Sequence, residues 1–211
     1  MAFRPLREKD GSNSSPGKSG RKGCPMIALG IAAAVMLVLG LALIGMYNGM
    51  IRGRNMAEEA WSGIDVQLKR RHDLVPNLVN TVQGYAAHEK EVFAAIAEAR
   101  SAIQKASGVQ AVAQAEGMLG SALGRLFAVA EAYPELKADG NFRQLQDTLA
   151  ALEDEIQMAR RYYNGTAREQ NNRTMQFPGN LVAGMFGFQK LEYFELDDVS
   201  ERAVPEVSFG K

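Results

Sequence analysis

The N-terminal quarter of this sequence contains a long stretch without any charged residue. It runs from Met26 to Ile51, and its central part, Ile27 to Tyr47, reads IALGIAAAVMLVLGLALIGMY. About 21 residues of α-helix at 1.5 Å rise span roughly 30 Å, the thickness of the hydrocarbon core of a bilayer. The stretch is longer than the core of a cleaved signal peptide, and Met46-Tyr47-Asn48 lacks the small residues of a cleavage site. The sequence therefore predicts a transmembrane helix over residues 26–51.

Two glycines near the end of this predicted helix, Gly45 and Gly49, have GxxxG spacing. Such spacing lets two membrane helices approach closely, although glycine is also frequent in membrane helices that make no such contact. Gly45 and Gly49 are candidates for a helix–helix contact in the membrane, and a homo-oligomer is one expectation that follows.

The charges before the predicted span are mostly basic. The first 22 residues carry six Lys or Arg against Glu8 and Asp10, while the whole sequence has a formal net charge of 0. A nucleic-acid-binding protein would carry its basic residues on the folded part, so we expect no nucleic-acid partner. Because residues 1–25 are rich in Gly, Ser, Pro and charge, they are predicted to form a disordered tail, as is the polar end over residues 196–211.

The side of the membrane that the folded part faces stays open. Lys18, Arg21 and Lys22 precede the span and Arg52 and Arg54 follow it, so the positive-inside rule favours a cytoplasmic N-terminus. Translation from Met26 would remove the basic tail and reverse that preference.

After residue 55, apolar residues recur with heptad spacing over about six heptads. Among thirteen positions in two columns, all but Arg71 and Glu89 are apolar, aromatic or Ala. Such a stripe predicts helices that pack at shallow angles. Pro76 interrupts it, and because proline costs about 3 kcal/mol inside a helix, we expect a kink or, preferably, a turn between two helices at residues 73–77.

Further helices follow, separated by clear turn signals. Ser107-Gly108 and Tyr133-Pro134 end two apolar stripes, and Asp139-Gly140 offers a capping residue before a long helix that runs from Phe142 towards Phe177. No segment alternates with period two. The sequence therefore predicts an all-α fold, a single N-terminal transmembrane helix followed by an up-and-down four-helix bundle over residues 52–195.

Residue types that perform catalysis are sparse. Cys24 is the only cysteine, and His72 and His88 are the only histidines. Neither a His-Glu-x-x-His pattern nor two Glu-x-x-His motifs is present. We therefore expect no enzyme activity, no metal or cofactor site and no small-molecule substrate.

Two segments remain as candidate contact sites. Arg70, Arg71 and His72 form a basic run that either pairs locally with Asp65 and Asp73 or binds an acidic partner or lipid headgroup. The second is a densely apolar block after the last long helix. It packs across the end of the bundle or docks on the bilayer or a partner protein, and its candidate contact residues are Phe177, Phe186 and Phe188.

Several of these segments resemble the LemA family. The resemblance is carried by AWSGIDVQLKRRHDLVPNLVNTVQGYAAHE at residues 60–89, by YPEL at 133–136 and by RRYYNGTAREQNNRTMQFPGNLVAGMFGFQKLEYFE at 160–195. It implies a bacterial cytoplasmic-membrane protein with a single span, a helical bundle and a poorly defined molecular function. Members of the family are often encoded near membrane-associated metallopeptidases, which suggests a role as a partner of such a protein.

The expected function is accordingly that of a membrane-anchored protein-interaction or scaffold module of the bacterial envelope, with the lipid bilayer and another membrane protein as partners. A self-assembling membrane scaffold and an accessory subunit of a membrane metallopeptidase are the alternatives.

Overall fold

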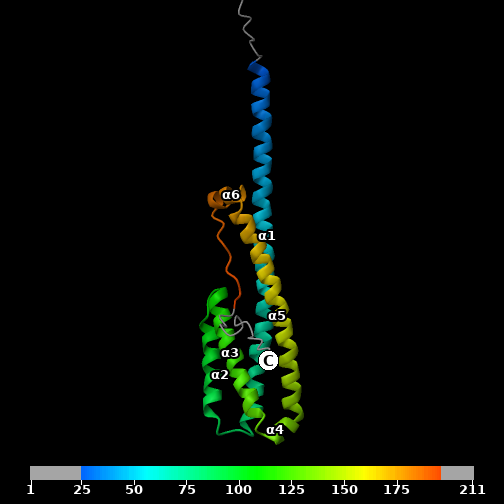
Figure 1. Ribbon diagram of the computed structural model, residues 1–211, viewed down its shortest axis with the longest axis vertical. Coiled ribbons are helices and arrows are strands. Elements are labelled where there is room, and N and C mark those ends of the chain that lie inside the picture. Colours follow the sequence, from blue (N-terminus) through cyan, green and yellow to red (C-terminus); the bar gives the residue numbers. More distant parts are fainter. Residues whose placement is uncertain (1–24, 196–211) are drawn as a thin grey trace, which may run out of the picture. The chain divides into compact units, whose positions relative to one another are not determined.

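The computed structural model describes residues 25–195 (Figure 1). The chain divides into two units, Met1–Ala42 and Leu43–Lys211. Cys24 and the two terminal segments predicted to be disordered, apart from Pro25, lie outside the described residues.

The described part of the first unit belongs entirely to helix α1 (Pro25–Gln83). Its apolar side chains, among them Leu29, Met36 and Leu39, are more than half exposed. Among the described residues, α1 is the one helix that is long and apolar enough to cross a membrane, and its most apolar window is not buried by the chain. The first unit therefore supplies a candidate membrane anchor.

The second unit contains the remaining part of α1 and five further helices. Over residues 25–195 every regular element is a helix, so the predicted all-α fold class is confirmed. The elements after α1 are α2 (Lys90–Lys105), α3 (Val109–Ala130), α4 (Pro134–Ala138), α5 (Gly140–Met175) and α6 (Gly179–Phe186).

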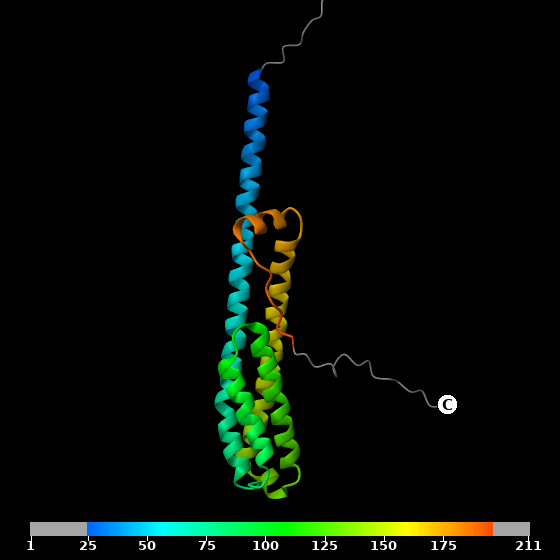
Figure 2. The same ribbon diagram turned by 90° about the vertical axis from the view of Figure 1, so that its left-hand side faces the viewer.

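The larger of the cores in this unit draws on all four long helices. Figures 1 and 2 show α1, α2, α3 and α5 side by side, with α4 joining α3 to α5 at their lower end. The buried side chains include Leu78 of α1, Ile96 of α2, Leu126 of α3 and Phe142 of α5. Packing of these apolar faces, rather than intrinsic helix propensity, is what stabilises helices of this length in water.

The predicted turn between two helices at Pro76 is wrong, because α1 continues through this residue to Gln83. Val75, Leu78 and Val82 are completely buried on both sides of the proline. Burying each such side chain contributes about 1.5–3 kcal/mol, which together exceeds the roughly 3 kcal/mol that an internal proline costs. The chain turns instead after Gln83, where the backbone N–H of Ala86 donates to the Val82 carbonyl at 2.8 Å.

The turns between the later helices lie where the sequence predicts them. Gly108 adopts φ +89° between α2 and α3, a conformation that favours glycine. Asp139 caps α5, and its carboxylate accepts a hydrogen bond from the backbone N–H of Phe142 at 2.9 Å.

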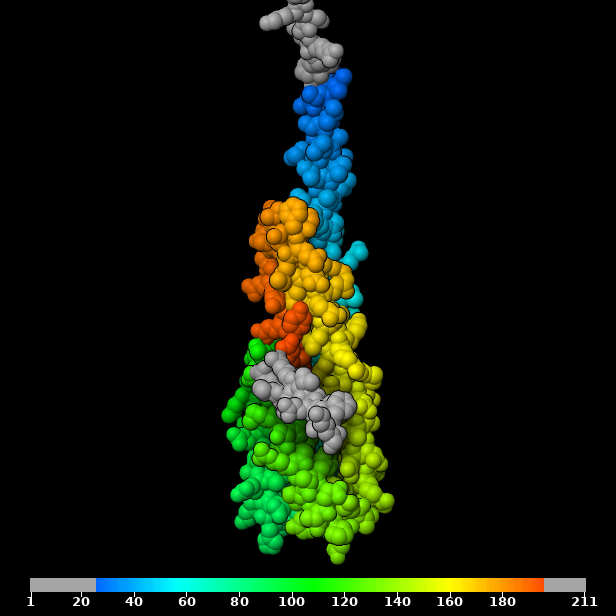
Figure 3. Space-filling model, viewed as in Figure 1, coloured from blue at the N-terminus to red at the C-terminus, as the bar shows by residue number. Residues whose placement is uncertain are grey.

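After α6, residues 188–195 return along α5 as an extended segment, here called the strap (Figure 3). Two asparagines of α5 hold it with four hydrogen bonds. The side-chain oxygen of Asn171 accepts from the Leu191 N–H at 2.7 Å, and its amide donates to the Leu191 carbonyl at 2.9 Å. Asn164 makes the same pair of bonds to Phe194, at 2.8 and 3.0 Å.

The spacing of this arrangement follows from backbone geometry. Asn164 and Asn171 are seven residues apart, about 10.5 Å along a helix axis. Leu191 and Phe194 are three residues apart, about 10 Å in an extended chain. The two repeats match, and Phe194 is thereby buried in a second core beside Trp61 and Tyr163.

Candidate functional site

A cleft with a volume of about 1070 Å³ runs along α3 in the second unit. Side chains of α2 and α5 line its two sides, and Arg71 of α1 reaches into it. Its floor along α3 includes Gly120, Ser121 and Gly124. Because these residues are small, they leave the backbone of α3 open to close approach.

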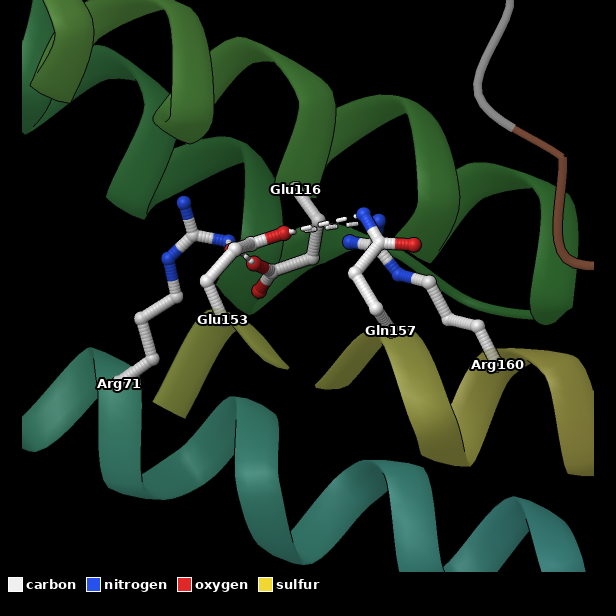
Figure 4. A network of polar contacts seen from close by, with 5 residues as sticks. All are labelled: Arg71, Glu116, Glu153, Gln157 and Arg160. Carbon is white, nitrogen blue, oxygen red and sulfur yellow. Dashed lines mark hydrogen bonds and ion pairs between the residues drawn. The ribbon is translucent and has the colours of Figure 1, made fainter. Parts of the chain in front are cut away.

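Five polar side chains gather at this cleft, and we call them the charge cluster: Arg71, Glu116, Glu153, Gln157 and Arg160 (Figure 4). An Arg71 guanidinium nitrogen lies 3.1 Å from the Glu153 carboxylate and 3.6 Å from that of Glu116. On the other side, Arg160 lies 4.0 Å from Glu153, and the Gln157 amide donates to Glu153 at 3.3 Å. Glu153 therefore links Arg71 of α1 to Gln157 and Arg160 of α5.

Glu116 is the most unusual member of the cluster. It is 1% exposed, and neither of its carboxylate oxygens makes a hydrogen bond to another described residue. Burial raises the pKa of this carboxyl to about 7. The positive charges of Arg71 and Arg160 act in the opposite direction, whereas the negative charge of Glu153 reinforces the rise. A buried polar group without a hydrogen-bond partner costs about 1–3 kcal/mol, and the ion pair with Arg71 at 3.6 Å offsets part of that cost at Glu116.

The structure separates the three residues of the predicted basic run. Arg71 points into the charge cluster, whereas Arg70 is exposed and lies 3.7 Å from Glu155. His72 is half-buried; burial and the nearby charge of Arg100 lower its pKa, against an opposing effect of Asp73. Residues 70–72 therefore do not form one basic surface.

The three phenylalanines of the apolar block differ in their surroundings. The rings of Phe186 and Phe188 pack against Tyr47 of α1, with centroids 4.7 and 5.8 Å away. Phe177, just before α6, is 80% exposed. The structure therefore brings Phe186 and Phe188 together on α1 and leaves Phe177 as an outward-facing side chain.

The two glycines of the predicted helix–helix contact, Gly45 and Gly49, also differ in their surroundings. A Cβ atom at either Gly45 or Gly49 would meet no heavy atom within 4 Å. The carbonyl of Gly49 accepts a hydrogen bond from Arg173 of α5 at 2.9 Å. One side of α1 at Gly49 is thus already used within the chain.

Sequence reasoning missed Glu116, Glu153 and Arg160 as parts of a site. The available signal was a charged residue inside an apolar stripe. Glu116 lies three residues before Leu119 and three after Ala113, both of which are buried. Arg71 carries the same signal and was identified by it. Among residues 25–195, no group of three or more His, Cys, Asp or Glu side chains is arranged to hold a metal ion.

Comparison with known proteins places this fold in a family. The LemA family model matches residues 60–209. The magnetosome protein MamQ of Magnetospirillum gryphiswaldense is 28% identical over 206 residues, covering 85% of this chain and 75% of its own length. Protein LemA of Metamycoplasma hominis is 29% identical over 161 residues, covering 74% of this chain and 72% of its own length. Because the family model spans more than half of the sequence, the chain belongs to the LemA family.

Proposed function

We propose that this protein is a membrane-anchored interaction module of the bacterial cytoplasmic membrane that binds a helix of a partner protein in the cleft along α3. It acts by presenting this cleft to its partner and performs no catalysis. The observation that carries the proposal is the cleft itself, an open volume of about 1070 Å³ along α3 that is lined by Arg71, Glu153 and Arg160 of the charge cluster.

The dimensions of the cleft support a helical occupant. A helix about 10 Å across occupies roughly 120 Å³ per residue at 1.5 Å rise, so the cleft has room for roughly nine residues, or between two and three turns. Gly120 and Gly124 on the floor allow such a helix to approach α3 closely, and Leu123 and Phe127 supply apolar contacts.

The chemistry of the charge cluster supports a hydrogen-bond donor on that helix. Within the cluster, Arg71 and Arg160 balance Glu116 and Glu153, so the site is close to neutral when all four are charged. The Glu153 carboxylate, whose side chain is 39% exposed, can accept a hydrogen bond from such a donor. The names of the relatives denote no enzyme, and a membrane-associated metallopeptidase, the partner class implied by the family resemblance, is the first protein to test.

Co-purification of the full chain in mild detergent tests this function. Gly124 lines the cleft and a Cβ there meets no heavy atom within 4 Å, so Gly124→Trp places an indole ring in the cleft, and circular dichroism checks that the variant keeps its helical content. Gly63 is equally exposed on α1 and does not line the cleft, so Gly63→Trp is the matched control.

We expect a stoichiometric partner that is retained by wild type and Gly63→Trp and is lost with Gly124→Trp. A partner retained equally by both variants would refute the cleft as the binding site. Recovery of the chain alone, with mass photometry showing oligomers, would instead favour a self-assembling scaffold. A reporter fused to the C-terminus determines which compartment the partner occupies.

A further inference from the structure

Helix α6 carries an apolar face that the chain itself leaves uncovered. Its inner face, Val182 and Ala183, is buried against Met50 of α1. On the outside, Leu181 and Met185 of α6 are 58% and 74% exposed, and Phe177, two residues before the helix, is 80% exposed. We call these three residues the outer face of α6.

The composition around the outer face is that of an interface with lipid. No charged residue occurs over residues 174–189, and a cation flanks this stretch at each end, Arg173 and Lys190. Short helices that lie at a membrane surface combine an exposed apolar face with flanking cations that reach the headgroups. Surface patches of this kind on soluble domains are usually covered by a partner or a membrane.

The place where α6 packs on α1 indicates that the bilayer covers the outer face of α6. Phe186 of α6 and Phe188 of the strap both pack on the ring of Tyr47. Leu43 and Ile44, within about one turn of Tyr47, are apolar and exposed, and they belong to the uncharged stretch that ends at Ile51. Three residues of helix correspond to about 4.5 Å, so a bilayer that covers Ile44 extends to within about that distance of the level of Tyr47.

The position of Tyr47 along α1 is typical of the boundary between membrane and water. Tyr and Trp are enriched where a membrane helix meets water, because their rings are apolar and their tips polar. Tyr47 follows about 21 residues of apolar helix, enough to cross the hydrocarbon core. An element that packs on the Tyr47 ring is therefore level with the membrane boundary.

We propose that the outer face of α6 inserts into the boundary between headgroups and acyl chains of the bilayer that α1 spans. α6 then lies in the membrane surface, and the strap and α5 tie it to the helices of the second unit. This inference is independent of what the cleft binds and shares with the proposed function only the membrane span.

Spin labelling of the full chain in pure-lipid vesicles tests it. In a Cys24→Ser background, single nitroxide labels are placed by Met185→Cys and Phe177→Cys on the outer face. Leu39→Cys labels the span. Met158→Cys, an exposed methionine of α5 at 56%, is the matched control outside the membrane. The vesicles contain phosphatidylcholine and phosphatidylglycerol and no other protein, which removes any protein partner.

The readout is the ratio of collisions with oxygen, which concentrates in lipid, to collisions with a water-soluble nickel chelate. We expect this ratio at residues 177 and 185 to be several-fold higher than at 158 and lower than at 39, because residue 39 lies about 12 Å deeper in the bilayer than the level of Tyr47. A ratio at 185 equal to that at 158, with a high ratio at 39, would overturn the proposal and leave the membrane span intact. Low collision rates with both reagents at 177 and 185 would also overturn it, because protein would then cover the outer face. A low ratio at 39 would refute the span and this proposal together, without bearing on partner binding in the cleft.

Discussion

Replacing Glu116 with glutamine is expected to change how the stability of the protein depends on pH. The folded protein raises the pKa of this carboxyl from its usual 4.5 to about 7. Each pKa unit corresponds to about 1.4 kcal/mol, so the difference amounts to about 3 kcal/mol. Glutamine has nearly the same shape and does not titrate, so the variant removes this contribution alone.

The direction in which the free energy of unfolding changes with pH depends on whether the folded or the unfolded state binds the Glu116 proton more tightly. Between about pH 4.5 and pH 7 the folded protein holds the Glu116 proton and the unfolded chain releases it. The contribution of Glu116 is therefore fully present below pH 4.5 and is lost as pH rises through about 7. Relative to Glu116→Gln, the free energy of unfolding of the wild type should fall by about 3 kcal/mol between pH 4 and pH 8.

Urea unfolding in detergent micelles measures this difference. Trp61 is the only tryptophan of the sequence, and its ring packs edge-on against Tyr163 at 5.5 Å, so its fluorescence reports on the core. Glu155→Gln removes an exposed carboxylate that lies 3.7 Å from Arg70, and we expect its pH profile to parallel the wild type.

Two results would contradict the reasoning. Parallel profiles of wild type and Glu116→Gln would show that the fold imposes no cost on ionising Glu116. A wild type that gains stability relative to the variant as pH rises would show that Arg71 and Arg160 hold Glu116 ionised, which reverses the direction of the pKa change.

Two further pairs of variants test the packing of α5 against its neighbours. Asn171→Asp replaces the amide that donates to the strap with a carboxylate facing a carbonyl, and should lower the free energy of unfolding by about 2 kcal/mol. Asn172→Asp, at the adjacent exposed position in the last turn of α5, should lower it by less than about 1 kcal/mol, the cost of a negative charge at a helix C-terminus. A Cβ at Gly53 would lie 2.2 Å from the side-chain oxygen of the buried Gln170, so Gly53→Ala should cost about 1–3 kcal/mol by overpacking. Gly63→Ala, on the open side of the same helix, should instead raise thermal stability by up to about 1 kcal/mol through helix propensity; equal effects of the two alanines would disprove the close approach.

The helices could be predicted from the sequence wherever a periodic apolar face and a turn signal coincide. Asp139 and Gly108 mark helix boundaries because a side-chain cap and a positive φ are local requirements. Pro76 misled the prediction because its cost is local, while the burial of Val75 and Leu78 depends on helices that contact α1 only after folding.

The candidate site could be predicted only in part, for a related reason. Arg71 stands out as a charge in an apolar column, but its pairing with Glu116 and Glu153 depends on the rotation of three helices about their axes. The sequence alone does not determine those rotations. The role of Asn164 and Asn171 was equally hidden, because a spacing of seven residues becomes informative only beside an extended segment whose repeat matches it.

The match in spacing between the two asparagines of α5 and the strap bears on aggregation. An extended segment normally presents unpaired N–H and carbonyl groups that can recruit a strand from another molecule. Here the side-chain amides of a helix take the place of a neighbouring strand, and each satisfies both backbone groups of one strap residue. An all-helical protein can in this way hold strand-like backbone along its surface and withdraw two of its residues, Leu191 and Phe194, from β-pairing, which requires asparagine at two fixed positions.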